Sequence, residues 1–393
     1  MWNSRKIGTK GINMITVLWM LVTNMLLYGY RVGSSAIYVK SMSMLETSSL
    51  SVWYSYLITW KTIGMFWLIT IICLGINIYV IYYMSRKNNW LQYWLSLFSM
   101  WMIVIVISSN MILSIIGYEM IGWISFVLIN YYVYRLESNK CSLISMLIGK
   151  LGDIGLIYSI MKLCSGKVSF SFIDLLYIKI IEELSLLLCC ISKSAQYFLH
   201  SWLILAMNGR TRVSALLLSS TLVTSGLMWF IILKIKISLG KLVILLCIIT
   251  FIMIGITSSY AFDSKRVIAY STSCQMSFVL IIVSLGYLWL GILLIITLGI
   301  NKSLLFLTTG IVISLNNLTQ DLRKLWISSS LTKLNLTLTT LNLIGFIFTS
   351  IFISKELIIY KFELNLYFYL DFLIIAASFI TIYYSIRLYI LLI

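Results

Sequence analysis

"LLLCCISKSAQYFLHSWLILAMNG", residues 186–209, carries a lysine, a glutamine and a histidine inside a run that is otherwise apolar. An ionisable side chain at the depth of a bilayer costs roughly 2.5–3.5 kcal/mol on insertion scales. Residues that are kept inside a membrane at such a cost are usually functional, so Lys193 is the first candidate for a functional role.

The composition around this stretch is that of an integral membrane protein. The 393 residues are 61% hydrophobic and only 10% charged, and the mean hydropathy is +1.01. Apolar windows of about 20 residues, the length that crosses a bilayer, recur along the whole sequence rather than once near its start. We expect an all-α integral membrane protein with about twelve transmembrane helices. Their predicted positions are 11–30, 55–83, 90–109, 111–134, 141–163, 178–205, 213–234, 241–261, 267–285, 287–315, 334–360 and 366–391.

The windows follow one another without a break in composition. No linker rich in proline, glycine or serine and no low-complexity tract separates them. Residues 1–393 are therefore predicted to form a single polytopic transmembrane domain.

The charge balance and the cysteines exclude several other classes of protein. The 29 lysines and arginines against 12 acidic residues give a net charge of +17, which in a soluble protein would suggest nucleic acid. Here most charges lie between hydrophobic runs, where they set the topology and meet anionic lipid head groups, so we expect no nucleic-acid partner. The seven cysteines lie in apolar runs without CxxC spacing, and a single histidine is present, so no metal site is predicted.

Six charged side chains lie inside the predicted spans, away from the membrane interfaces. Lysine suits a proton relay because a desolvated lysine can bind or release a proton near neutral pH, whereas arginine stays protonated. A glutamate together with buried lysines supplies the groups that such a relay needs. The six residues are Glu119, Lys150, Asp153, Lys193, Lys302 and Lys355.

Simpler explanations exist for some of these residues. Lys150 and Asp153 are three apart on one helix face, so a structural ion pair is as good an explanation as a functional one. A lone histidine near a helix end, such as His200, is more often a satisfied polar residue than a relay member. The sequence contains no nucleotide-binding glycine loop and no catalytic triad, and it carries no recognisable redox centre.

Several blocks in a fixed order carry a resemblance to a known family. From about residue 54 to 393 the chain resembles the antiporter-like subunit 5 of mitochondrial NADH:ubiquinone oxidoreductase, respiratory complex I, in a truncated and divergent form. The blocks are "GYEMIGWISF" (117–126), "LGDIGL" (151–156), "KSAQYFLHSWLILAMNGRTRVSALLLSSTLVTSG" (193–226), "DSKRVIAYSTSCQMSF" (263–278), "NKSLLFLTTGIVI" (301–313), "QDLRKL" (320–325) and "SKELII" (354–359).

The resemblance implies a role for four of the charged residues. Glu119 matches the family's membrane glutamate, which would modulate the lysine of "KSAQ", Lys193, across a helix interface. Lys302 matches the central-channel lysine, and Lys355 matches the lysine that marks subunit 5. Together they are predicted to form a proton relay.

Two further residues match positions near the relay. Asp153 matches an aspartate that follows the glutamate helix, and His200 matches a residue that is commonly histidine in mitochondrial members. Both are predicted to be modulators of the relay.

The family also implies a fold, cofactors and partners. The fold consists of two inverted helical repeats with broken helices. FMN, iron-sulfur clusters and ubiquinone would be held by other subunits of the complex, in the inner mitochondrial membrane. The expected partners are other membrane-arm subunits, above all the antiporter-like subunit 4, together with lipids such as cardiolipin. The family's long C-terminal lateral helix is absent from 54–393, and a separate chain is expected to supply it.

The chain departs from the family pattern where relay histidines and helix-breaking prolines are expected. Leu218, Leu294 and Leu298 stand in place of histidines, and the whole chain contains no proline. We still expect breaks in the spans that hold Lys193 and Lys355, because polar side chains can satisfy the backbone groups that a break releases. The polar residues available there are Ser194, Gln196, Thr349 and Ser350, and the residues in place of prolines are Ile204, Arg210, Arg212 and Ile347.

Two rival functions remain open at this point. A stand-alone cation/proton antiporter subunit would share the same blocks but would lack flavin and iron-sulfur partners. A structural membrane-arm subunit that no longer pumps would explain the missing histidines. The mass and cofactor content of the native complex would separate the first rival from the respiratory assignment.

Overall fold

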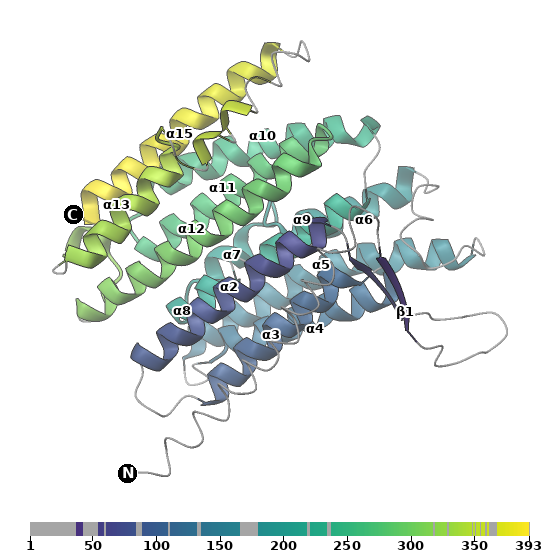
Figure 1. The fold of residues 1–393 in the computed structure, drawn as a ribbon, viewed down its shortest axis with the longest axis horizontal. Coiled ribbons are helices and arrows are strands. Elements are labelled where there is room, and N and C mark those ends of the chain that lie inside the picture. The colour runs from purple at the N-terminus through teal and green to yellow at the C-terminus, as the bar shows by residue number, and fades with distance from the viewer. Residues whose placement is uncertain are drawn as a thin grey trace.

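A computed structural model describes most of the chain from residue 60 onwards, together with two short strands before it (Figure 1). The described residues are 37–41, 54–58, 60–83, 89–108, 111–131, 135–165, 180–217, 221–233, 237–316, 319–327, 330–347, 349, 351–353, 355–357, 360 and 368–392.

Helices account for nearly all of this structure, because apolar windows of this length bury their backbone hydrogen bonds within the segment itself. The all-α membrane class predicted from the sequence is therefore confirmed. In chain order the helices are α2 (Trp60–Tyr83), α3 (Asn89–Ile107), α4 (Met111–Ile129), α5 (Leu136–Ser165), α6 (Ile180–Lys193), α7 (Ser201–Ala206), α8 (Thr211–Leu216), α9 (Leu222–Leu233), α10 (Ile237–Tyr260), α11 (Ser264–Ser284), α12 (Leu288–Leu315), η3 (Leu322–Lys324), α13 (Ser330–Ile344) and α15 (Phe368–Leu392).

The long helices form two groups that lie side by side (Figure 1). The first group contains α2, α3, α4, α5, α6 and α9, and the second contains α10, α11, α12, α13 and α15. Helix α12 of the second group also packs against α2 of the first group and against α8.

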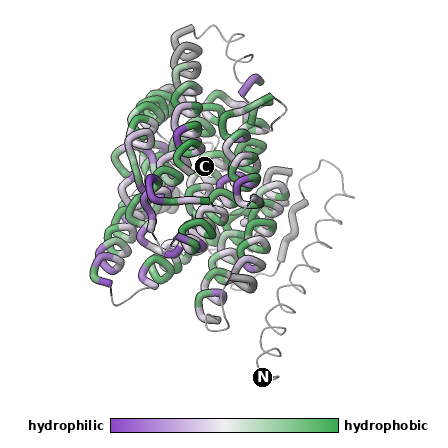
Figure 2. Tube along the Cα trace, turned by 90° about the vertical axis from the view of Figure 1, so that its left-hand side faces the viewer, coloured by the Kyte–Doolittle hydropathy of each residue, from purple (hydrophilic) through white to green (hydrophobic). Residues whose placement is uncertain are grey.

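Apolar side chains cover the outside of the bundle as well as its interior. Most of the tube along the helices is hydrophobic (Figure 2). Large side chains such as Trp123, Leu147 and Met253 are exposed, which is unusual in a soluble protein and expected where lipid replaces water.

Six described helices are long and apolar enough to cross a membrane. The chain is therefore a multi-pass membrane protein. The count of twelve spans stays a prediction, and the first of them, 11–30, lies outside the described residues. The six segments are Trp90–Ile107, Ile112–Ile129, Leu136–Ser159, Leu242–Tyr260, Ser264–Ser284 and Leu288–Leu315.

The predicted span 55–83 starts too early. Residues Tyr54–Ile58 form strand β2, which pairs antiparallel with β1, Ile37–Ser41, and the helix begins only at Trp60. Tyrosine and isoleucine favour the pleated conformation, so an apolar window here did not imply a helix.

Helices α5 and α6 approach each other closely at two glycines. A Cβ atom at Gly152 would overlap the Ser192 hydroxyl, and a Cβ atom at Gly155 would overlap the Ser185 carbonyl oxygen. Small residues allow such close backbone approach between membrane helices. The approach brings Asp153, next to Gly152, against the end of α6.

The predicted break after Lys193 is confirmed. Helix α6 ends at Lys193, and helical structure resumes at Ser201. Between them Ala195 and Phe198 adopt φ angles of 54° and 76°, which no α-helix contains. The Trp202 indole N–H donates to the Ser192 carbonyl at 2.8 Å, so a side chain from beyond the break satisfies a carbonyl at the end of α6.

The predicted break before Lys355 is confirmed as well. Helix α13 ends at Ile344, and Gly345 has a φ angle of 79°. Thr349 supplies a hydroxyl to the irregular segment, because its Oγ1 donates to the Phe346 carbonyl at 2.7 Å. Both breaks therefore form in a chain without proline.

Candidate functional site

Lys193 is buried at the point where α6 breaks. Its Nζ lies 3.7 Å from Asp153 Oδ1 on α5 and 4.2 Å from the centre of the Tyr118 ring on α4. Tyr118 is itself fixed, because its hydroxyl donates to the Cys189 carbonyl at 3.0 Å. The ammonium group thus has an anion on one side and an aromatic face on another, and both stabilise its charged form.

Two more charged side chains extend this pair into a row. Lys150 Nζ lies 3.4 Å from Asp153 Oδ2 and 3.5 Å from Glu119 Oε1. The order Glu119, Lys150, Asp153, Lys193 alternates in charge across α4, α5 and α6. We call these four residues the charge row. Glu119 therefore connects to Lys193 through Lys150 and Asp153, across the interfaces of α4, α5 and α6.

Burial increases along the charge row. The side chains of Glu119 and Lys150 are 44% and 41% exposed, whereas those of Asp153 and Lys193 are 7% and 5% exposed. A cavity beside the row is lined by its inner three members, Lys150, Asp153 and Lys193. The row thus connects the bundle surface with its interior.

Glycine leaves space around the inner lysine. A Cβ atom at Gly122 or Gly149 would lie 3.5 or 3.6 Å from Lys193 Nζ. Both distances are ordinary van der Waals contacts, so glycine at these positions leaves open the space beside the ammonium group.

Lys302 is completely buried in the middle of α12 and has a different environment. Its Nζ lies 2.6 Å from the Ser271 hydroxyl on α11. Within the described part of the chain, no carboxylate lies within 4.0 Å of this nitrogen. The charged form of Lys302 therefore relies on a neutral hydroxyl.

Lys355 lies beside the second helix break. Its Nζ donates to the Ile344 carbonyl at 3.1 Å and to the Thr381 hydroxyl on α15 at 3.2 Å. Its aliphatic chain packs on Gly345, with Cδ 3.3 Å from the position of a Cβ atom there. Lys355 thus caps the last carbonyl of α13, as basic side chains do at helix C-termini.

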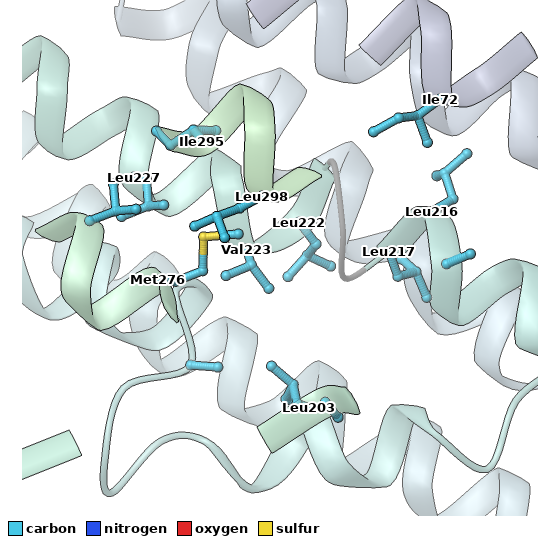
Figure 3. Close-up of a cluster of buried hydrophobic side chains, with 14 of the residues drawn as sticks. Ile72, Leu203, Leu216, Leu217, Leu222, Val223, Leu227, Met276, Ile295 and Leu298 are labelled. Carbon is cyan, nitrogen blue, oxygen red and sulfur yellow. The ribbon is translucent and has the colours of Figure 1, made fainter. Parts of the chain in front are cut away.

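Side chains of α9, α11 and α12 form an apolar layer. Figure 3 shows Leu222, Val223 and Leu227 of α9 together with Met276 of α11 and Leu298 of α12. All five side chains are buried. Leu298 is one of the leucines that stand where the family pattern predicts a histidine, so apolar packing replaces a titratable group here.

His200 does not join the charge row. Its ring stacks on Tyr197, with ring centres 5.7 Å apart and planes 7° from parallel. Its Nδ1 is buried and has no hydrogen-bond partner among the described residues. The structure therefore shows a packed histidine at the break, and its predicted role as a modulator stays a prediction.

Two residues of this site, Lys150 and Tyr118, were not predicted from the sequence to belong to the relay. Lys150 was visible as one of the charged groups within the spans, and its spacing from Asp153 was the available signal. Tyr118 had no signal beyond its place next to Glu119, because only the packing of α4 against α6 brings its ring to Lys193.

Comparisons with known proteins identify similar sequences and a similar fold. Residues 108–381 match the family described as "NADH:quinone oxidoreductase/Mrp antiporter, TM". "NADH-ubiquinone oxidoreductase chain 5" of Rhizopus stolonifer is 32% identical, with 98% of this chain and 62% of that protein covered. The protein of the same name from Acanthamoeba castellanii is 31% identical, with 95% and 61% covered.

A solved structure has the same fold. The Mrp complex from Dietzia sp. DQ12-45-1b matches with a TM-score of 0.78 and 20% identity, over 90% of this chain and 41% of that one. The chain spans about three fifths of the length of the relatives named above.

Proposed function

The chain belongs to the NADH:quinone oxidoreductase/Mrp antiporter membrane family, and on this basis we propose that it is a proton-translocating membrane-arm subunit of respiratory complex I. The observation that carries the proposal is the charge row, which ends on a lysine at a helix break. The names of its sequence relatives favour the respiratory complex over other members of the family.

Proton transfer by the charge row follows from its alternating charges. A proton that neutralises Asp153 removes the anion that stabilises Lys193, so Lys193 then releases its own proton more readily. The opposite change, in which Lys150 moves from Asp153 towards Glu119, strengthens the contact of Asp153 with Lys193. The row is thus an electrostatic switch whose state at Glu119 is transmitted to Lys193.

Lys302 and Lys355 complete the proposed path in the second helix group. Each is a lysine whose described polar contacts are with neutral groups, so each can hold a proton temporarily. Glu119, Lys193, Lys302 and Lys355 are the groups proposed to carry the proton, with Asp153 and His200 as modulators.

The partners and location follow from the proposed complex. FMN, iron-sulfur clusters and ubiquinone would be bound by other subunits, and their redox chemistry would drive the switch. The neighbouring chain would be the antiporter-like subunit 4, and anionic lipids such as cardiolipin would surround the arm in the inner mitochondrial membrane. The single transmembrane domain of residues 1–393 stays a prediction.

Replacing the inner lysine tests the proposed function. Lys193→Met keeps the length of the side chain but cannot carry a proton, so proton translocation by the complex in sealed vesicles should fall at least about tenfold, the effect of losing about 1.4 kcal/mol of stabilisation. Lys324→Met is the control, because Lys324 is exposed in η3 and outside the row. Wild-type translocation by the Lys193 variant would contradict the proposal.

A second candidate function is a cation/proton antiporter subunit that works without electron transfer. The fold match to an Mrp complex favours it. Purification of the native complex separates the two, because bound flavin and iron-sulfur clusters are expected only for the respiratory complex.

A third candidate is a membrane-arm subunit that no longer pumps. The leucines Leu294 and Leu298 near Lys302 favour it, because they cannot transfer protons. The Lys193 and Lys302 variants decide this alternative, since a purely structural subunit would tolerate both without loss of translocation.

A further inference from the structure

The interface between α11 and α15 contains a line of polar side chains between the two lysines of the second helix group. Lys302 contacts Ser271 at one end, and Lys355 contacts Thr381 at the other. In the middle, Gln275 Nε2 donates to the Tyr384 hydroxyl at 3.2 Å. These contacts join α11, α12, α15 and the segment around Lys355.

Helix periodicity joins the three contacts into one seam. Ser271 and Gln275 are four residues apart on α11, and Thr381 and Tyr384 are three apart on α15, so each pair shares one helix face. All four side chains are at least nine-tenths buried. We call Ser271, Gln275, Thr381 and Tyr384 the polar seam.

Burying the polar seam lowers the stability of the fold, which indicates that its polar groups have a function. A buried polar group that lacks a hydrogen bond costs about 1–3 kcal/mol. Gln275 Oε1 is buried and accepts no hydrogen bond from a described residue, so it is an open acceptor next to the Tyr384 hydroxyl. Aliphatic residues at Gln275 and Tyr384 would avoid that cost, as they do in the apolar layer of Figure 3.

Hydroxyl groups can pass protons because each can accept one proton and release another. Ser271, Tyr384 and Thr381 therefore have the required chemistry, whereas an amide such as Gln275 serves better as a holder. One helical turn of about 5.4 Å separates the contacts along each helix, so a water molecule must bridge successive hydroxyls.

We propose that the polar seam is the route by which a proton passes between Lys302 and Lys355, with Tyr384 as its central catalytic hydroxyl and Gln275 as the residue that positions it. The Lys302 ammonium gives its proton to the Ser271 oxygen, which releases its own proton to water. Tyr384 accepts a proton from that water and releases its own through a second water to Thr381. Thr381 passes its hydroxyl proton to neutral Lys355, which becomes the ammonium. This inference rests on the proposed function and identifies its second half.

The seam also accounts for how the chain works without the family's histidines. The seam lies on α11 and α15, whereas Leu294 and Leu298 lie on α12. A path through hydroxyls of neighbouring helices does not need a titratable group at those leucine positions.

The decisive experiment removes one oxygen atom from the seam. Tyr384→Phe keeps the buried ring and loses only the hydroxyl. Tyr383→Phe is the matched control, because Tyr383 is the neighbour of Tyr384 on α15 and its own side chain is exposed. In the native complex reconstituted into sealed vesicles, we expect Tyr384→Phe to lower the ratio of protons translocated to NADH oxidised at least twofold. The Tyr383 variant should match the wild type, and both variants should assemble normally.

A second variant separates the roles within the seam. Gln275→Met removes the amide but leaves the Tyr384 hydroxyl in place, so its loss should be smaller than that of Tyr384→Phe. The rate of proton translocation should fall further on transfer from H2O to D2O for Gln275→Met than for the wild type, because a poorly held hydroxyl slows proton transfer, whereas a packing defect would leave this isotope effect unchanged.

The outcomes distinguish this inference from the proposed function. If Tyr384→Phe translocates protons as the wild type does while Lys193→Met and Lys302→Met do not, the polar seam is not the route and the proposed function stands. If both lysine variants translocate normally, the proposed function itself is wrong and the seam has no proton to carry.

Discussion

Lys193 and Lys302 are both buried lysines within membrane helices, but their surroundings differ. Lys193 lies next to Asp153 and ends a row of four alternating charges, whereas Lys302 contacts the Ser271 hydroxyl and no described carboxylate within 4.0 Å. In the first helix group a carboxylate balances the ammonium. In the second group a neutral oxygen solvates it.

This difference assigns different tasks to the two regions. An ion pair in a medium of low dielectric holds its partners strongly, so its state changes only when another charge changes nearby. A hydroxyl stabilises a charge less, so a lysine beside it gains and loses a proton with smaller rearrangements. The first region is therefore suited to switching, and the second to transfer.

Removing the partner of each lysine should lower the stability of the complex by unequal amounts, and this is the largest difference that we expect. Asp153→Asn leaves Lys193 buried without its anion, and breaking such a pair costs about 3–5 kcal/mol. Ser271→Ala removes one hydroxyl from Lys302 and should cost about 1–3 kcal/mol. Thermal unfolding of the two purified variant complexes measures the difference. Equal losses of stability would mean that the Asp153 carboxylate stabilises its lysine no more than the Ser271 hydroxyl does.

A comparison of the two helix breaks should give a change in stability of intermediate size. The first break places Ala195 and Phe198 at positive φ, whereas the second uses Gly345 at 79°. Gly345→Ala should cost about 1–2 kcal/mol because the new Cβ atom disfavours that conformation. It should also lower proton translocation, since the Cβ atom meets the Lys355 chain at 3.3 Å.

Gly286 provides the control for this prediction. Its φ angle is 91°, and a Cβ atom there would meet nothing within 4 Å. Gly286→Ala should therefore lose similar stability and keep full translocation. An equal loss of translocation in both variants would show that backbone strain alone, rather than displacement of Lys355, explains the effect.

The outer end of the charge row should give the smallest change in stability. Glu119 and Lys150 are both more than 40% exposed, and ion pairs at that exposure contribute about 0–1 kcal/mol. Glu119→Gln should therefore leave the melting temperature nearly unchanged and still lower proton translocation, because the switch loses its outer charge. Glu137→Gln, at the exposed start of α5, is the control. Normal translocation by the Glu119 variant would remove Glu119 from the switch.

Much of the fold followed from local sequence patterns. Apolar windows placed α3, α10 and α12 close to their observed bounds, because a membrane helix satisfies its own backbone and therefore needs a continuous apolar segment. The window at 55–83 was misjudged at its start, where strand pairing between β1 and β2 overrode the apolar signal. Such pairing depends on a second segment, so a single window does not reveal it.

The breaks were predictable in position and partly in construction. At the break after Lys193, two of the expected polar residues satisfy carbonyls, because the Ser194 hydroxyl donates to the Ile191 carbonyl and the Gln196 amide donates to the Ser194 carbonyl, each at 3.5 Å. Two further contacts were not expected. The Trp202 indole reaches the Ser192 carbonyl, while the Gln196 amide oxygen accepts a hydrogen bond from Thr250 on α10. These partners follow from how the chain folds back after Lys193, which no local pattern encodes.

The sequence by itself determined that this is a helical membrane protein of a known family and that a few charged residues lie inside its spans. Hydropathy and charge are properties of each segment, so they can be read without neighbours. Only the tertiary structure decided that Lys150 stands between Glu119 and Asp153, and that Tyr384 meets Gln275. Those contacts join residues on different helices, and their distances are set by the packing of whole helix faces at positions such as Gly152.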